Sequence, residues 1–190
     1  MAKYETYLLQ DLREFGEFLK LIRENNVRSY LEIGSKNGGS LWRIATTLPR
    51  GSRVVSVDLP HGDLSFKETA PNLQACIAEL KRRGYDSHLF MADSTDPRTV
   101  EGVHALGPFD LCLIDANHTE PYVRKDWANY GPMARIVAFH DIAWKRVVHD
   151  TKKLPIDVPK VWAEIKGGYK HTEIRYCPQD NGIGVLWRDI

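Results

Sequence analysis

The sequence predicts an α/β protein whose doubly wound, mostly parallel β-sheet carries helices on both faces. Three observations lead to this fold class: strand-like and helix-like segments alternate along the chain, a glycine-rich loop follows the first strand-like segment, and an acid ends the second. Such alternation places parallel strands side by side and their connecting helices across the sheet. The 190 residues fit a single domain, 1–190, in which 1–27 form an N-terminal helical extension.

The first half of the chain predicts a helix followed by three strand–helix units. Apolar residues from Leu8 to Ile22 recur at helical spacing, and this helix is expected to end near Asn25. The next helices are expected at 41–48, around 73–80 with a stop at Gly84, and at 99–106. The strands between them are expected at 29–33, 53–57 and 87–91.

The second half predicts two more parallel strands and then a strand pair. Strands at 109–114 and 135–139 enclose a helix at 120–130. A helix interrupted by Pro155 and Pro159 comes next, and strands at 170–177 and 182–187 are joined by a turn at 178–181. This late pair predicts antiparallel pairing at one edge of an otherwise parallel sheet.

The glycine-rich loop predicts a binding site for a nucleoside-containing cofactor. Residues 34–40 read Gly-Ser-Lys-Asn-Gly-Gly-Ser, between an expected strand and an expected helix. Glycines at this place let a ligand approach the backbone near the unpaired N–H groups of a helix start. Asp58 ends the second strand, where a carboxylate can accept hydrogen bonds from both hydroxyls of a ribose.

Lys36 separates this loop from the dinucleotide-binding pattern. That pattern, G-x-G-x-x-G, needs a glycine where Lys36 stands, so a nicotinamide oxidoreductase is the less favoured function. The pattern acid-x-Gly-x-x-x-Gly-Gly-Ser resembles motif I of S-adenosylmethionine-dependent methyltransferases with a Rossmann-like fold. It is most similar to the branch that includes cephalosporin-hydroxylase-like proteins and metal-assisted sugar and catechol O-methyltransferases. Lys36 departs from that family too, which usually has a further glycine there.

This resemblance implies a seven-stranded sheet with one antiparallel strand and a site for S-adenosylmethionine. In that site Asp58 contacts the ribose, Asp93 contacts the adenine amino group, and Gly34 faces the methionine part. The implied cofactor-binding residues are Glu32, Gly34, Ser35, Gly38, Ser40, Asp58, Asp93, Ser94 and Asp115. The structural alternative for any single acid of this set is that it caps the helix that follows its strand.

Two further segments resemble the metal-assisted branch. Residues 114–122 resemble its I-D-x-x-H-x-x-x-x-Y signature, and Phe-His-Asp at 139–141 resembles its strand-five motif. These strands are neighbours in the fold, roughly 4.8 Å apart, so Asp115 and Asp141 can converge on one cation. The implied ligands are Asp115, His140 and Asp141, for Mg²⁺ or Mn²⁺. Alternatively, Asp115 contacts only the cofactor, Asp141 caps the next helix, and no metal binds.

Histidines at the same strand ends are candidates for the general base. His118 follows the fourth strand and His140 ends the fifth, whereas His61, on the loop after Asp58, is less well placed. An imidazole titrates near neutral pH and can accept a hydroxyl proton. The expected catalytic residues are His118, His140 and Asp115. Alternatively, His118 only orders the acid loop through hydrogen bonds.

These features predict transfer of a methyl group from S-adenosylmethionine to a hydroxyl of a small molecule. The alternative is a protein that binds S-adenosylmethionine without turnover, as a sensor or a partner-dependent subunit. The net charge of +1 and the lack of a basic stripe argue against nucleic acid, and no apolar run is long enough to span a membrane. We expect a cytoplasmic protein with reduced cysteines at 76, 112 and 177, and the N-terminal helix could pair between subunits of a homo-oligomer.

Overall fold

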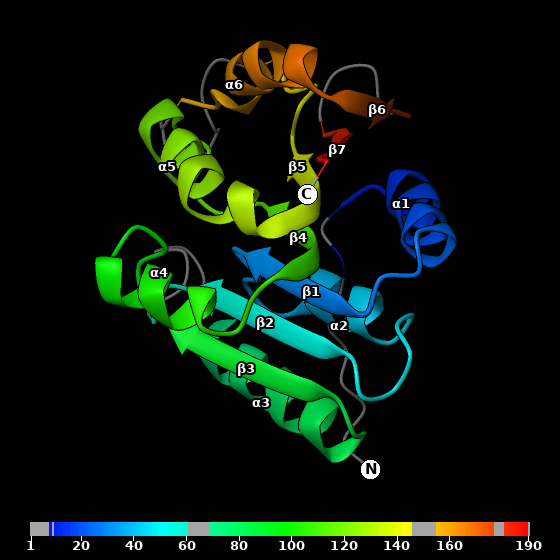
Figure 1. Ribbon diagram of the computed structural model, residues 1–190, viewed down its shortest axis with the longest axis vertical. Coiled ribbons are helices and arrows are strands. Elements are labelled where there is room, and N and C mark those ends of the chain that lie inside the picture. The colour runs from blue at the N-terminus through cyan, green and yellow to red at the C-terminus, as the bar shows by residue number, and fades with distance from the viewer. Residues whose placement is uncertain (1–7, 9, 61–68, 146–154, 177–180, 190) are drawn as a thin grey trace.

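The computed structural model describes Leu8 and residues 10–60, 69–145, 155–176 and 181–189. It forms one seven-stranded sheet in the order β3-β2-β1-β4-β5-β7-β6 (Figure 1). The strands are β1 (Ser29–Ile33), β2 (Arg53–Asp58), β3 (Asp86–Met91), β4 (Phe109–Ile114), β5 (Ala134–His140), β6 (Lys170–Ile174) and β7 (Ile183–Trp187). The α-helices are α1 (Leu12–Glu24), α2 (Gly39–Ala45), α3 (Thr69–Arg82), α4 (Pro97–His104), α5 (Glu120–Tyr130) and α6 (Val158–Ile165).

The strand directions confirm the predicted fold class. Strands β1 to β5 pair in parallel, and β7 is antiparallel to both of its neighbours, β5 and β6. The late strand pair lies at one edge of the sheet, as expected, with β6 outermost and the reversed strand β7 between β6 and β5. Inserted there, β7 buries nearly all of its residues, whereas β6 at the edge buries none fully.

Two apolar clusters cover the two faces of the sheet, as the doubly wound class requires. One face packs against α1, α2 and α3 through buried side chains such as Phe18, Ile44 and Leu73. The other packs against α4, α5 and α6 through side chains such as Val103 and Trp162. The thiols at 76 and 112 are buried and free, in agreement with the expectation of reduced cysteines.

Helix boundaries follow local capping chemistry that periodicity alone does not resolve. Asp11 accepts hydrogen bonds from the N–H groups of Arg13 and Glu14, so α1 begins at Leu12 instead of Leu8. Pro159 lies in the first turn of α6, where a missing N–H costs nothing, so it opens this helix and does not interrupt it. Positions 61 and 177–180, on which expectations from the sequence fall, lie outside the described residues.

Helix α1, in the predicted N-terminal extension, contributes buried side chains to the core. Figure 1 shows it beside the β6–β7 end of the sheet, and it contacts both strands. Its buried Glu14 carboxylate accepts the N–H groups of Tyr176, at 2.7 Å, and of Gly182, at 2.9 Å. The apolar face of α1 is thus used within the chain, and a homo-oligomer through that face stays a prediction.

The strand order has a topological switch point between β1 and β4. The chain runs from β1 outward to β3, then crosses back to β4 on the other side of β1. Neighbouring parallel strands whose connections leave in opposite directions open a crevice at their carboxyl ends. The ends of β1, β2, β4 and β5 therefore frame the candidate site.

Candidate functional site

The β1–α2 loop has a backbone that only glycine accommodates at two positions. Gly34 has φ +91°, and its N–H donates to the Val57 carbonyl at 2.9 Å. A Cβ on Gly34 would overlap the backbone of Asp115 and Ala116, so the loop lies directly against the start of the β4–α5 connection. Gly38, at φ +83°, precedes α2 and leaves its backbone close to the Cys76 side chain.

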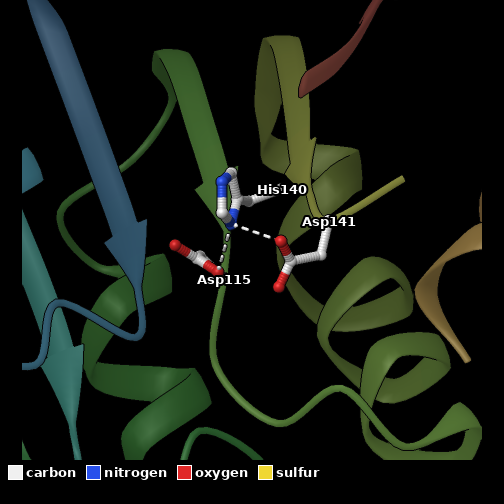
Figure 2. A group of neighbouring side chains, drawn as sticks. All are labelled: Asp115, His140 and Asp141. Atoms are coloured by element: carbon white, nitrogen blue, oxygen red, sulfur yellow. Dashed lines mark ion pairs between the residues drawn. The ribbon is translucent and has the colours of Figure 1, made fainter. Parts of the chain in front are cut away.

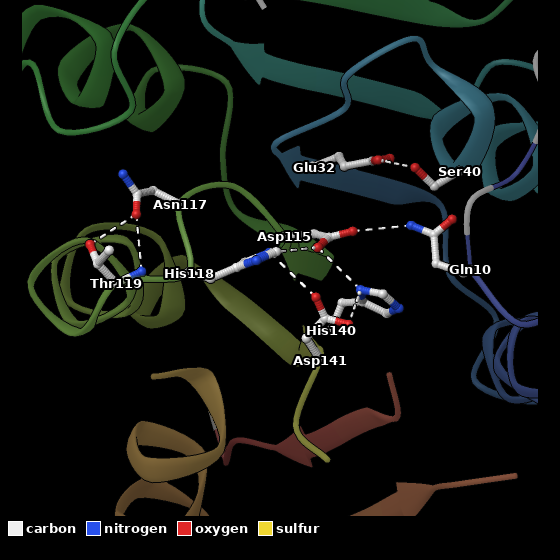
Figure 3. A network of polar contacts seen from close by, with 9 residues as sticks. All are labelled: Gln10, Glu32, Ser40, Asp115, Asn117, His118, Thr119, His140 and Asp141. Atoms are coloured by element: carbon white, nitrogen blue, oxygen red, sulfur yellow. Dashed lines mark hydrogen bonds and ion pairs between the residues drawn. The ribbon is translucent and has the colours of Figure 1, made fainter. Parts of the chain in front are cut away.

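Two of the predicted cofactor residues, Glu32 and Ser40, hydrogen-bond to each other across the two ends of this loop. Glu32 is fully buried and accepts hydrogen bonds from the Tyr30 hydroxyl, at 2.6 Å, and from the Ser40 hydroxyl (Figure 3). Burial, only partly offset by these hydrogen bonds, raises the pKa of Glu32 to about 8. Nearby, Ser56 donates to the Ser35 hydroxyl at 2.7 Å. These hydrogen bonds connect both ends of the loop to strands β1 and β2.

Asp58 lies beside the loop, as the sequence predicted. Its carboxylate accepts the backbone N–H of Lys36 and, at 2.7 Å, that of Leu59. Burial raises the pKa of Asp58, while these backbone hydrogen bonds act against the rise. The left-handed backbone of Lys36, φ +50°, directs its N–H to the carboxylate. The residue that departs from the dinucleotide pattern therefore connects the glycine loop to the end of β2.

The end of β3 places Asp93 and Ser94 at the same edge of the sheet. Asp93 Oδ1 accepts the N–H and the hydroxyl of Thr95, at 2.8 and 2.9 Å. The Ser94 hydroxyl donates to Asp126 Oδ1 of α5 at 2.7 Å. The predicted adenine residues are therefore held by their neighbours in a fixed turn.

Two acids and a histidine converge at the ends of β4 and β5. Figure 2 shows Asp115, His140 and Asp141 with His140 Nδ1 between the two carboxylates, 3.2 Å from an oxygen of each. Ligand atoms of the three residues lie within 4.8 Å of one another, a spacing that fits a single metal ion. His140 Nε2 is buried and has no hydrogen-bond partner among the residues that the structure describes.

The charges in this cluster shift one another's protonation. Burial alone would raise the pKa of Asp115, but the neighbouring His140 and His118 hold it well below its usual range. Burial alone would lower the pKa of His140, but Asp115 and Asp141 outweigh it and raise this pKa to about 9. The protonated, positively charged form of His140 is thus favoured between the carboxylates of Asp115 and Asp141.

His118 approaches the cluster from the α5 side (Figure 3). Its Nε2 lies 3.4 Å from Asp115 Oδ1 and 3.6 Å from Asp141 Oδ2. Its carbonyl accepts the N–H of Asp157, whose carboxylate in turn accepts the N–H of Glu120 at 2.9 Å. The start of α6 therefore fixes the loop that carries His118, and both predicted base candidates lie at one site.

Comparison with known proteins identifies the family. Residues 31–142, more than half of the chain, match a family model described as a methyltransferase domain. The chain belongs to this methyltransferase family. The matched segment contains the glycine loop and the acid cluster described above.

Solved structures share the fold of this methyltransferase at low sequence identity. The O-methyltransferase TomG from Streptomyces achromogenes, solved with SAM, is 20% identical, with TM-score 0.67, over 96% of this chain and 82% of that chain. An O-methyltransferase from Bacillus cereus, solved with SAH, is 16% identical, with TM-score 0.66, over 94% and 82%. Cofactor-bound Rv0187 from MTB is 18% identical, with TM-score 0.68, over 97% and 84%. No curated protein sequence matches the chain significantly.

No helix within the described ranges is long and apolar enough to cross a membrane.

Two residues of this methyltransferase, Gln10 and Asp126, were not predicted from the sequence to have a part in the site. Gln10, which precedes α1, donates to Asp115 Oδ2 at 3.0 Å, and no local pattern connects two residues 105 positions apart (Figure 3). Asp126 is fully buried in α5 between Val123 and Tyr130, which share the inward side of the helix. An acid within an apolar helical stripe was the signal that could have revealed it.

Proposed function

We propose that this protein transfers a methyl group from S-adenosylmethionine to a hydroxyl oxygen of a small molecule, as one domain over 1–190. The observation that carries the proposal is the direct contact between two places: the glycine loop at Gly34 lies against Asp115, the first residue of the acid–histidine cluster. Membership of the methyltransferase family supports methyl transfer. Neighbours of the same fold that were solved with SAM or SAH support the choice of cofactor and of oxygen.

Each part of S-adenosylmethionine is assigned to residues at the strand ends that could still form hydrogen bonds with it. The methionine part would lie along the loop at Gly34, Ser35 and Gly38. The Asp58 carboxylate accepts backbone N–H groups of Lys36, Leu59 and Ser35, and a carboxylate has about four acceptor sites, so capacity remains for a ribose hydroxyl. Adenine would lie at Asp93 and its neighbour Ser94. In this arrangement Glu32 and Ser40 support the loop, and Asp115 borders both the cofactor and the acceptor.

The acid–histidine cluster fits a divalent cation. Two carboxylates and one imidazole nitrogen converge, and Mg²⁺ prefers such carboxylates together with substrate oxygens, whereas the nitrogen suits Mn²⁺ equally. Asp115, His140 and Asp141 would hold the ion, with His140 in its neutral form. When bound, the ion would lower the pKa of the acceptor hydroxyl and orient it.

His118 is proposed as the base that takes the hydroxyl proton. Its Nε2 faces Asp115 and Asp141 at 3.4 and 3.6 Å and lies outside the three-residue ligand group. The acceptor oxygen would form a bond to the methyl carbon as the sulfur–carbon bond breaks, leaving S-adenosylhomocysteine. Because this displacement is in line, the protein contributes mainly by alignment and proton removal. Without a metal, His140 is the second candidate for this role.

The acceptor is proposed to be a small hydroxylated molecule such as a sugar, catechol or polyketide. The side chains at the ends of β4 and β5 are polar and partly anionic, so hydroxyl groups would find hydrogen-bond acceptors there. The net charge of +1 gives a nucleic acid no electrostatic support.

Calorimetric titration and a methyl-transfer assay test the proposal together. S-adenosylmethionine and S-adenosylhomocysteine should both bind, and labelled methyl groups should reach the oxygen of at least one acceptor from a panel of sugars, catechols and phenols. Transfer should stop in chelator and return with Mg²⁺ or Mn²⁺.

Three other results of these assays would change the proposal. Binding of S-adenosylhomocysteine without transfer to any acceptor would support the alternative of a binding protein without turnover. Full activity in chelator would exclude a metal from the proposed reaction and leave the histidines as the candidates for the base. Absence of binding would overturn the proposed function.

A further inference from the structure

The two oxygens of the Asp115 carboxylate have different surroundings. Oδ1 points into the acid–histidine cluster, 3.2 Å from His140 Nδ1 and 3.4 Å from His118 Nε2. Oδ2 accepts a hydrogen bond from Gln10 Nε2 at 3.0 Å. Figure 3 shows Gln10 on the other side of Asp115 from His118. The carboxylate is therefore held in one orientation, with a single oxygen turned to the cluster.

The start of α1 holds Gln10 in place without help from Asp115. Gln10 directly precedes Asp11, whose side chain accepts two backbone N–H groups of the first helical turn. Helix α1 is in turn packed against β6 and β7. Two residues before Gln10, the Leu8 side chain packs against the buried apolar cluster on the same face of the sheet. The amide of Gln10 thus extends to the site from an anchored backbone.

The donor to Asp115 Oδ2 is neutral, although the carboxylate is largely buried. Only 12% of the Asp115 side chain is exposed, and a buried carboxylate oxygen needs a hydrogen-bond donor. A lysine or arginine at this place would supply the donor but would also cancel the negative charge that attracts a cation. The Gln10 amide orients the carboxylate and leaves its charge available to the cluster.

The orientation of Asp115 bears on which divalent cation the cluster can hold. Mg²⁺ demands a nearly ideal octahedron of ligands, whereas the larger Ca²⁺ takes more oxygens and often both oxygens of one carboxylate. The candidate ligand set has one atom from each of Asp115, His140 and Asp141, all within 4.8 Å of one another. To bring its second oxygen to the same ion, Asp115 would have to rotate and give up the hydrogen bond from Gln10, a bond to a charged group that is costly to lose.

We propose that Gln10 is a positioning residue that restricts Asp115 to one metal-ligating oxygen and thereby selects Mg²⁺ or Mn²⁺ over Ca²⁺. This inference rests on the proposed function, because it takes the acid–histidine cluster as a cation site. Gln10 does not bind the ion and acts through Asp115 alone. It also lies outside residues 31–142, which match the family model, so the selectivity is assigned to a segment that the family match does not include.

The test measures cation preference through binding, independently of turnover. The protein is titrated with Mn²⁺ at constant pH, and the free ion is followed by electron paramagnetic resonance. Ca²⁺ is then added as a competitor, and its affinity is obtained from the Mn²⁺ that it releases. The wild-type protein should prefer Mn²⁺. In Gln10→Leu, which fills the space without a donor, this preference should fall on the order of tenfold, mainly through tighter Ca²⁺ binding, because Asp115 can then offer both oxygens.

Two further variants separate the hydrogen bond from packing. Gln10→Ala also removes the donor but leaves a space, and it should lower the preference as much as Gln10→Leu does. Gln74→Leu is the matched control, since Gln74 is an exposed glutamine of α3, and it should leave both affinities as in the wild type.

The outcomes distinguish this inference from the function on which it depends. If the wild-type protein binds S-adenosylhomocysteine but neither ion, the metal part of the proposed function fails and the inference fails with it. If the wild-type protein binds Mn²⁺ and both Gln10 variants keep its preference, only the part assigned to Gln10 is overturned. Equal weakening of both ions, or a changed preference in Gln10→Ala alone, would also overturn it, because Gln10 would then support the cluster by packing.

Discussion

The acids at the ends of β1 and β2 each have separate hydrogen-bond donors, whereas those at the ends of β4 and β5 share a histidine. Glu32 accepts hydrogen bonds from the hydroxyls of Tyr30 and Ser40, and Asp58 accepts the backbone N–H groups of Lys36 and Leu59. Asp115 and Asp141 are held together by a histidine placed between them. Acids at equivalent strand ends therefore differ in their surroundings: the first pair is bonded into the glycine loop and the backbone beside it, and the second pair concentrates negative charge around one imidazole.

The largest effect that this comparison predicts is on turnover. Asp141→Ala should reduce methyl transfer by about 1000-fold while S-adenosylhomocysteine affinity stays within about fivefold, because we propose that this carboxylate acts on the acceptor side. Steady-state kinetics and calorimetry measure the two quantities. Asp86→Ala is the matched control, since Asp86 is an exposed acid at the opposite end of the sheet and should leave both unchanged. Loss of cofactor binding in Asp141→Ala would show that the two regions are not separate in function.

A smaller effect is expected at Asp58, on cofactor affinity. Asp58→Ala should weaken S-adenosylhomocysteine binding by about 1.5–3 kcal/mol, the range for hydrogen bonds to a charged group. Because Asp58 also anchors the Lys36 N–H, part of this loss could come from the loop. A 2′-deoxy analogue separates the two causes: the wild-type protein should bind it more weakly than the parent compound, and the variant should bind both equally. A variant that still discriminates would place the ribose elsewhere.

The smallest effect concerns the stability of the loop region against pH. The pKa of Glu32 is about 8 in the folded protein and near 4.5 in the unfolded chain, so the folded state binds more protons between these values. Stability from this group is complete below about pH 4.5 and is lost as the pH rises towards 8. Between about pH 5.5 and 7 the wild-type protein should lose about 1–2 kcal/mol relative to Glu32→Gln, as measured by urea unfolding. Parallel curves for the two proteins would mean that Glu32 stays ionised when folded.

Local patterns allowed the fold and the strand ends to be predicted from the sequence. A run such as 109–114 forms a strand because its neighbours on both sides are apolar, and the acid that follows it must then lie at the sheet edge. Contacts between distant segments were beyond such reasoning. Nothing around Gln10 indicates that it reaches Asp115, and the partner of Asp126 depends on how α5 rotates over β3. The position of the candidate site's charged residues at the strand ends was thus predictable, and the groups that hydrogen-bond to them were not.

The carboxylate of Glu14 has a consequence for the order in which this protein can form during synthesis. It bonds to Tyr176 and Gly182, which lie 162 and 168 residues later. At about 5–20 residues per second, the ribosome takes many seconds to supply these partners after α1 has emerged. Until then a buried acid and the apolar side of α1 lack their native surroundings. Helix α1 is made long before these partners, so its surroundings are completed late, and the nascent chain must keep it from other partners in the meantime.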